Sequence, residues 1–128
     1  MTFEDLDVFK AAIELIAAIY ETTESFPSRE QYGLTSQLRR AAISVAANIA
    51  EGQGRLSNGE WRQMLSHSRG SLYEIEAEVI VAHRIAYIDS AVRDHLRKMC
   101  KDVGAPLAGL IRYVQRQEAI AKKRTGNR

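Results

Sequence analysis

The least polar part of the chain is the stretch of residues 41–50. Within it only Ser44 and Asn48 are polar, so a helix formed by these residues is apolar nearly all round. Such a helix must be covered on most sides, either by its own bundle or by other chains. Its apolar residues are mainly alanines, which let neighbouring backbones approach closely, and we expect Ala46 at a close helix–helix crossing. The pattern predicts the central helix of the fold.

Glycines and small polar residues mark the ends of this central helix. Gly33 breaks the preceding structure, and Thr35 or Ser36 is expected to cap the first free N–H groups. Gly52 and Gly54 then end the helix in the manner of a glycine C-cap. Its apolar surface is larger than one bundle needs, which predicts an oligomer larger than a dimer. The residues that extend beyond the face of Leu38, Val45 and Ile49 are Ile43, Ala46, Ala47 and Ala50.

Apolar residues at alternating steps of three and four predict two further helices. The first starts at the capping-box pattern of residues 2–5 and ends near Phe26-Pro27, because the residue before proline avoids the helical region. The second starts at a capping box in residues 57–60, between Leu56 and Trp61 as a hydrophobic staple, and runs to about Ile85. Their predicted core lines are Leu6, Phe9, Ile13, Ile16 and Tyr20, widened by Ala12, Leu15 and Ile19, and then Trp61, Leu65, Ser68, Leu72, Ile75, Val79 and Ala82.

The last helix is expected to start at Asp89 or Ser90, after a short connection. Pro106 predicts a kink there and not an end, because the apolar period resumes after it. The short connections make successive helices antiparallel neighbours. We therefore predict an all-α, up-down-up-down four-helix bundle over residues 1–121, followed by a basic, flexible tail in residues 122–128. The expected core line of the last helix is Val92, Leu96, Met99 and Val103, continued by Leu107, Leu110, Ile111 and Val114.

Several motifs of the chain resemble those of the four-helix-bundle proteins encoded by intervening sequences in bacterial 23S rRNA genes. The central ones are residues 32–41, which read Tyr-Gly-Leu-Thr-Ser-Gln-Leu-Arg-Arg-Ala, and residues 47–52, which read Ala-Asn-Ile-Ala-Glu-Gly. Further matches are residues 3–9, Phe26-Pro27, residues 57–61 and residues 70–74. The resemblance implies a bundle that assembles into a ring-like homopentamer without established enzymatic activity. Its more distant relatives include retroelement accessory proteins that bind nucleic acid and a reverse transcriptase.

The composition places the chain among ordinary single-domain globular proteins. Its 128 residues are 45% hydrophobic and 27% charged, and its one cysteine, Cys100, excludes an internal disulfide and fits a reducing compartment. The acidic start has no leader pattern and no apolar run spans a bilayer, so we expect a cytoplasmic protein. Charge is polarised along the chain. Residues 1–30 hold seven acids against two bases, whereas residues 93–128 hold ten bases against three acids. Either the polarity steers partners or pairs subunits head to tail, or the first and last helices lie side by side, which is favoured because these two are often neighbours in a bundle.

Polar residues follow one side of each of the two central helices. They form either a ligand or cation pocket or a hydrogen-bond network that joins helices or subunits, with Arg39, Arg40 or Arg69 compensating the carboxylates. The network is favoured because buried polar groups need partners and the chain supplies several. The residues are Asn48, Glu51 and Gly52, and then Ser68, Ser71, Glu74 and Glu78. In the resemblance, Asn48, Glu51, Gly52, Gly70, Ser71 and Glu74 are the shared positions, which implies a role in folding and assembly.

Catalytic and metal patterns find little support. A di-iron bundle needs Glu-x-x-His pairs, but Met64, Ile80 and Val92 stand three residues before the three histidines. Arg62 and His67 have a spacing that resembles the motif of helical RNases, yet the two side chains diverge by roughly 140° around the helix. Surface residues are the simpler interpretation of this short motif. We expect no cofactor and no metal.

The strongest functional pattern is a basic stripe on the last helix. Repeated by oligomeric symmetry, it would present many charges to a nucleic-acid backbone, with little sequence preference because aromatic residues are sparse. A solvated helix face without a partner is the alternative. Nucleic-acid binding is favoured over it because the distant retroelement relatives bind nucleic acid. We therefore expect a homo-oligomeric scaffold that binds RNA or DNA. A protein-binding adaptor is the alternative, and an RNase the more distant one. The stripe comprises Arg93, Arg97, Lys98, Lys101, Arg112, Arg116, Lys122, Lys123 and Arg124.

Overall fold

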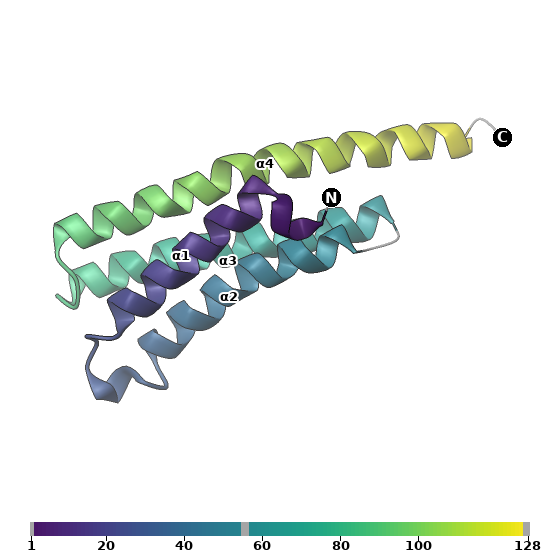
Figure 1. Ribbon diagram of the computed structural model, residues 1–128. Helices are drawn as coiled ribbons and strands as arrows, with labels where there is room; N and C mark the ends of the chain where they lie inside the picture. Colours follow the sequence, from purple (N-terminus) through teal and green to yellow (C-terminus); the bar gives the residue numbers. More distant parts are fainter. Residues whose placement is uncertain (1, 55–56, 127–128) are drawn as a thin grey trace.

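Four long helices make up the fold. The computed structural model describes residues 2–54 and 57–126, and within these ranges it contains helices and no strand, which confirms the all-α four-helix prediction. In Figure 1 each helix runs back along the one before it, and the last helix extends past the others toward the C-terminus. The elements are η1 (Phe3–Asp5), α1 (Asp7–Thr23), η2 (Ser28–Glu30), α2 (Leu34–Gln53), α3 (Asn58–Arg84) and α4 (Ser90–Gly126), where η marks a 3-10 turn.

A single apolar core lies between the four helices. Helix α2 packs on α3, α3 on α4, and α1 on both α2 and α4, so the acidic first helix and the basic last helix are neighbours. Helix α2 buries more alanines than any other described helix, and Ala46 is among them at 6% exposure. Its core residues are Leu38, Ala41, Ala42, Val45, Ala46 and Ile49. The central helix is thus covered on most sides by its own bundle.

The core face of α1 is centred on one side of the predicted stripe. The buried residues are Val8, Ala12, Leu15 and Ile19, whereas Ile13 and Tyr20 of the predicted line are 44% and 40% exposed. Two apolar lines run side by side on this helix. The line that contains Ala12 faces inward, since a small residue permits close approach to α2 and α4. The other line is left partly uncovered by the chain itself.

The core lines of α3 and α4 agree with their periodicity. Helix α3 buries six residues of the expected line, from Leu65 to Ala82, and only Trp61 is half-buried. Its one further buried residue is Glu78, which no apolar period could indicate. On α4 the buried line includes Cys100, while Val92 and Met99 pack at its margin. Burial raises the pKa of the Cys100 thiol to about 12.

The start of α2 is capped differently from the prediction. Gly33 is the N-cap residue, and neither Thr35 nor Ser36 caps the helix by its side chain. Instead the Glu30 carboxylate accepts a hydrogen bond of 3.3 Å from the Leu34 N–H. The Tyr87 hydroxyl also donates to Glu30 at 2.7 Å, and these two bonds lower the pKa of that carboxyl. An acid at a helix N-terminus also complements the macrodipole.

The predicted capping residues of α3 and α4 are confirmed. Ser57 accepts a hydrogen bond of 3.1 Å from the Glu60 N–H, and Asp89 accepts one of 2.9 Å from the Val92 N–H. The pattern at residues 2–5 caps the turn η1, and α1 begins only at Asp7. The staple residue Leu56 lies outside the described residues. Helix α1 ends at Thr23, three residues before the predicted stop.

Helix α4 is continuous through Pro106 and runs to Gly126. The expected end of the bundle near residue 121 is therefore not a helix end, and Lys122, Lys123 and Arg124 belong to the last turns of α4. The kink at Pro106 stays a prediction. Among the described residues, no helix combines the length and the hydropathy that a membrane span requires.

The turn between α3 and α4 holds a residue in an unfavourable conformation. Ala86 has a φ of 67°, in the left-handed region that favours glycine. Its N–H bonds to the carbonyl of His83, and the next N–H, of Tyr87, bonds to the carbonyl of Ala82. These two bonds form a Schellman motif, in which glycine is the usual residue at this position.

Replacing Ala86 with glycine is expected to stabilise the protein. A left-handed alanine costs about 1–2 kcal/mol, and the extra freedom of glycine in the unfolded chain offsets part of the gain. We expect a net gain of about 0.5–1 kcal/mol in the free energy of unfolding, measured by urea denaturation. Ala91→Gly, on the exposed first turn of α4, is the matched control and should lose up to about 1 kcal/mol. Loss of stability in Ala86→Gly would contradict the argument.

Candidate assembly and nucleic-acid surfaces

A chain of hydrogen bonds joins α2 to α3 near the middle of both helices. The Asn48 side chain donates to the Ser44 carbonyl at 2.9 Å and to the Ser44 hydroxyl at 3.0 Å. Ser71 donates to the same Ser44 hydroxyl at 2.9 Å, and the buried Ser68 donates to the Val45 carbonyl at 2.8 Å. Of the polar residues singled out by sequence, Asn48 and Ser71 bind Ser44 and Ser68 binds the Val45 carbonyl, so these three take part in a hydrogen-bond network between the helices. Ser44 is the member that sequence reasoning did not place, although its i, i+4 spacing to Asn48 was a usable signal.

Gly52 and Gly70 have opposite surroundings. A Cβ added at Gly52 would lie 2.8 Å from Cδ1 of Trp61 and 3.4 Å from Cβ of Met64, so the glycine permits close packing of α2 against the start of α3. A Cβ added at Gly70 would meet nothing within 4 Å, and this residue is exposed in the middle of α3. Packing within the described chain therefore explains Gly52 and does not explain Gly70. The nearby Glu51 is exposed at the end of α2.

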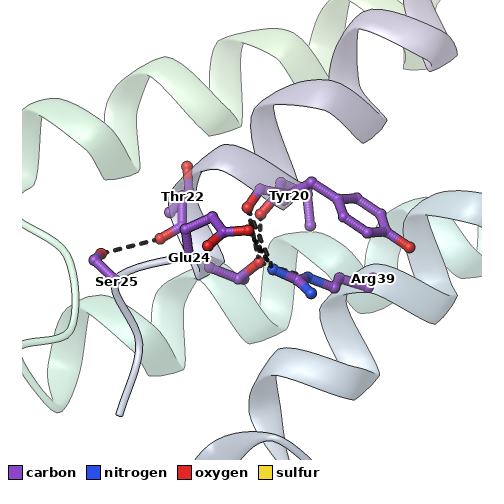
Figure 2. A network of polar contacts seen from close by, with 7 residues as sticks. Tyr20, Thr22, Glu24, Ser25 and Arg39 are labelled. Carbon is purple, nitrogen blue, oxygen red and sulfur yellow. Dashed lines mark hydrogen bonds and ion pairs between the residues drawn. The ribbon is translucent and has the colours of Figure 1, made fainter. Parts of the chain in front are cut away.

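Arg39 fastens α2 to the end of α1, as Figure 2 shows. Its guanidinium lies over the Tyr20 ring, 4.5 Å from the ring centre, and donates to the Thr23 hydroxyl at 2.9 Å and to the Tyr20 carbonyl at 3.4 Å. It also lies 3.9 Å from the Glu24 carboxylate. Stacking and hydrogen bonds together hold this arginine in place. Arg39 thus acts within the bundle, and it does not compensate Glu74 or Glu78.

Arg40 is placed differently from its neighbour. It is exposed, and within the described residues it makes no ion pair or hydrogen bond. It lines two grooves, one of about 530 Å³ with Tyr20 and Ile43 and one of about 620 Å³ with Ser71 and Glu74. The guanidinium therefore stands at the border between the α1–α2 side and the α2–α3 side of the molecule. Arg69, the third arginine considered, is exposed on α3.

Glu78 is a carboxyl group buried on α3. It is 7% exposed, and neither carboxylate oxygen has a hydrogen-bond partner. Burial is the main reason why its pKa is raised to about 7, and the neighbouring Glu74 carboxylate raises it further. The pair thus resembles two acids that share a site and cannot both ionise easily.

Two separate groups of large apolar side chains remain exposed. The first lies on α1 and α2 and comprises Ile13, Tyr20 and Ile43, with exposures of 40–45%. The second lies on α3 and comprises Tyr73 at 64%, Ile80 at 49% and Val81 at 48%. We call them the α1–α2 apolar face and the α3 apolar face. Exposed Gly70 and Ala77 lie on the same side of α3 as Tyr73, at helical spacing. Apolar surfaces of this kind are typical of contact sites.

The basic residues of α4 fall into two groups. Three are held by acids within the described chain: Arg93 by Asp94 at 2.9 Å, Lys98 by Asp102 at 3.1 Å and Lys122 by Glu118 at 3.7 Å. Arg93 also contacts His83, at 3.3 Å. Six others are exposed and have no ion pair to a described residue. They are Arg97, Lys101, Arg112, Arg116, Lys123 and Arg124.

Five of these six unpaired residues form a row along one side of α4. At ~100° per residue, Arg97, Lys101, Arg112, Arg116 and Lys123 lie within about 100° of one another around the helix. Asp102 and Glu118, the two acids within this span, point roughly 100° away from Lys101 on either side. Arg97 and Lys101 also line a shallow hollow of about 320 Å³ together with Asp94 and Lys98. We call these five residues the α4 basic row.

Arg62 and His67, the two residues with the spacing of helical RNases, do not form a common site. Arg62 is bound to Glu118 of α4, with Nε 3.1 Å from Oε2, which makes it a link between α3 and α4. His67 is exposed on α3, five residues along the helix. Within the described residues, no group of three or more His, Cys, Asp or Glu side chains could hold a metal ion.

The chain is a small four-helix-bundle protein with two exposed apolar faces and one basic row on its surface. A family model of the 23S rRNA-intervening sequence proteins matches residues 4–109 of the chain. The chain belongs to this family, as the motifs of the α2 region indicated. A sequence comparison with curated proteins found no match.

Proposed function

We propose that the protein is a non-enzymatic, homo-oligomeric scaffold of the cytoplasm that binds nucleic acid through the α4 basic row. The row itself carries the proposal. Five exposed basic side chains without an acidic partner follow one helix side, over a length that matches several phosphates of a nucleic-acid backbone. Tyr113 is the one exposed aromatic residue of α4, so base stacking contributes little. We expect charge-driven binding with weak sequence preference.

Self-assembly is supported by the two apolar faces. They consist of different residues on different helices, so a contact between them is heterologous: the α1–α2 apolar face of one subunit meets the α3 apolar face of the next. Contacts of this kind close into rings when the rotation between subunits permits. A ring repeats the α4 basic row once per subunit and thereby multiplies the phosphate contacts. The resemblance of the α2 region suggests five subunits.

Light scattering tests the assembly. At micromolar concentration we expect a mass above that of a dimer of the 14.4 kDa chain. Replacing Tyr73 with lysine places a charge in the α3 apolar face and should lower the mass without loss of helicity. Lys10→Gln, on the exposed side of α1, is the matched surface control. A wild-type mass of 14.4 kDa at these concentrations would contradict the proposal.

Filter binding across a salt series tests the nucleic-acid proposal. With single-stranded and structured RNA we expect binding at about 50 mM salt that weakens steeply by about 200 mM, because phosphate contacts release counterions. The slope of log K against log salt should be about −0.7 to −0.9 for each phosphate neutralised. If the wild type does not bind RNA at about 50 mM salt, the nucleic-acid proposal fails.

A protein-binding adaptor is the second candidate function. It is favoured by the same apolar faces, provided that one of them stays open in the assembled protein. The adaptor function is distinguished from nucleic-acid binding by a wild-type protein that assembles, binds no RNA, and retains an exposed apolar face. The RNase hypothesis has weaker support, because Glu118 already holds Arg62. It predicts RNA cleavage that is lost in His67→Ala.

A further inference from the structure

Four members of the α4 basic row form two pairs with an uncharged interval between them. Arg97 and Lys101 lie one helical turn apart, and so do Arg112 and Arg116, and all four side chains are exposed. Residues 102–111, which separate the pairs, contain no basic residue. The row therefore presents positive charge at separated places and not as a continuous line.

Helix α4 holds the two pairs at a fixed separation. It is continuous from Ser90 to Gly126, so Lys101 and Arg112 are about 16 Å apart along its axis, at ~1.5 Å per residue. Figure 1 shows α4 as one unbroken helix along the edge of the bundle. Between the pairs, the side of α4 that carries the row holds Ala105 and Ala108, both uncharged. A matching ligand carries negative charge at two places about this far apart and needs none between them.

A single-stranded nucleic acid matches this arrangement poorly. Proteins that bind single strands use a basic groove that follows the backbone, together with aromatic rings on which the bases stack. The row lies on the outer, convex side of a helix. Tyr113, the exposed aromatic residue of α4, points about 100° away from Arg112 around the helix. Its ring packs edge-on against Trp61 of α3, with 6.3 Å between the ring centres, and is not part of the row.

A double helix has charge at two separated places. Its two phosphate backbones border a groove, and the wide major groove of B-DNA measures about 12 Å. In A-form RNA the minor groove is the wide and shallow one. Because lysine and arginine side chains are long, pairs about 16 Å apart reach the phosphates on both borders of such a groove. Ala105 and Ala108 then lie over the groove, where there is no phosphate, and Lys123 lies about 10 Å beyond Arg116, at the second border.

We propose that the α4 basic row binds double-stranded nucleic acid, with α4 lying across a wide groove and its two basic pairs on the phosphates of opposite strands. The inference rests on the proposed nucleic-acid binding and specifies the form of the ligand. Contacts to phosphates carry no direct sequence information, so the shape of the duplex and not its base sequence is recognised. Each pair meets one strand, and the two pairs should therefore contribute about equally.

Filter binding of matched probes tests the preference for a duplex. The probes are a duplex of slightly more than one turn and its two separated strands, made once as DNA and once as RNA. At about 100 mM salt we expect the wild type to bind the duplex on the order of 10-fold or more tightly than either strand. This preference in DNA or in RNA supports the inference, and its absence in both overturns it.

Two duplexes of equal charge test the contact with both strands. In the first, neutral methylphosphonate linkages replace every phosphate of one strand. In the second, the same number of neutral linkages alternates along both strands. A protein that contacts both strands loses about half of its phosphates in either case, so the two affinities should agree within a few-fold. If the duplex with one intact strand binds 10-fold or more tightly than the other, the contact follows a single strand and the inference is wrong.

Paired substitutions test whether both ends of the row take part. Arg97→Gln with Lys101→Gln, and Arg112→Gln with Arg116→Gln, should each lower the slope of log K against log salt for the duplex by roughly two. Lys10→Gln with Arg69→Gln, at exposed positions outside α4, is the charge-matched control and should leave the slope unchanged. A loss in only one of the two α4 variants would contradict the two-strand contact.

The failure of this inference differs from the failure of the proposed function. If the wild type binds neither duplexes nor single strands at about 50 mM salt, nucleic-acid binding fails and the inference fails with it. If it binds single strands as tightly as duplexes, nucleic-acid binding stands and only the double-stranded ligand is wrong.

Discussion

Replacing Arg97, Lys101, Arg112 and Arg116 together with glutamine is expected to reduce RNA affinity on the order of 100-fold or more at about 100 mM salt. Each lost phosphate contact should also lower the slope of log K against log salt by roughly one. The four side chains are exposed and carry no ion pair to a described residue, so their loss breaks no ion pair of the described bundle. We therefore expect unchanged helicity, melting temperature and mass.

A charge-matched variant separates a local surface from overall charge. Lys10, Arg29, Arg69 and Arg84 are exposed and lie on α1, η2 and α3. Changing these four to glutamine lowers the net charge by the same amount but leaves α4 intact. Its affinity should stay within a few-fold of the wild type. Equal losses in the two variants would show that net charge, and not the α4 basic row, attracts the nucleic acid.

Replacing Gly52 with alanine is expected to destabilise the bundle, although alanine is the better helix former. The gain in helix propensity is at most about 1 kcal/mol. The added methyl group would lie 2.8 Å from the Trp61 ring, and overpacking of this kind costs about 1–3 kcal/mol. Since Trp61 is the only tryptophan, its fluorescence should report the displaced ring directly. We expect a melting temperature several degrees lower, at about 4 °C per kcal/mol.

Gly70→Ala is the matched control for this prediction. The same change occurs in a helix interior, but the added methyl group meets nothing within 4 Å. Helix propensity alone then raises the stability of the single chain by up to about 1 kcal/mol. A Gly70→Ala variant that folds well but assembles poorly would place Gly70 in a subunit contact. Equal stabilisation in both glycine variants would contradict the close approach of Trp61 to α2.

The number and order of the helices could be predicted from sequence, because periodicity and capping residues act over short distances. The core lines of α3 and α4 followed for the same reason. The face of α1 was predicted with its centre displaced: Ala12, Leu15 and Ile19 were expected at its margin and lie at its centre. The line through Ile13 and the line through Ala12 are both apolar at helical spacing, and only packing against α2 and α4 distinguishes them. Sequence gave more weight to the bulkier line, whereas the bundle buries the one with the smaller residue.

Contacts between distant residues were the other limit of sequence reasoning. Polar faces were visible on both central helices, but the Ser44–Ser71 bond depends on the register between α2 and α3. The basic residues of α4 were likewise visible as a set. Which of them are held by Asp94, Asp102 and Glu118, and which stay available, required the positions of the acids. The end of α4 was placed too early, because its last turns lack the apolar residues that a periodicity argument uses.

Because Cys100 is buried, chemical labelling of its thiol reports transient opening of the core at α4. At 1% exposure, and with a thiol pKa raised to about 12, this side chain is closed to solvent and almost wholly un-ionised at neutral pH. A thiol-modifying reagent can therefore react only in molecules whose α4 has come away from the core. When reclosing is faster than modification, the labelling rate measures the free energy of that opening in the native protein. Comparing the labelling rate of Cys100 with and without RNA would show whether RNA bound on the outer side of α4 makes the opening of α4 from the core less frequent.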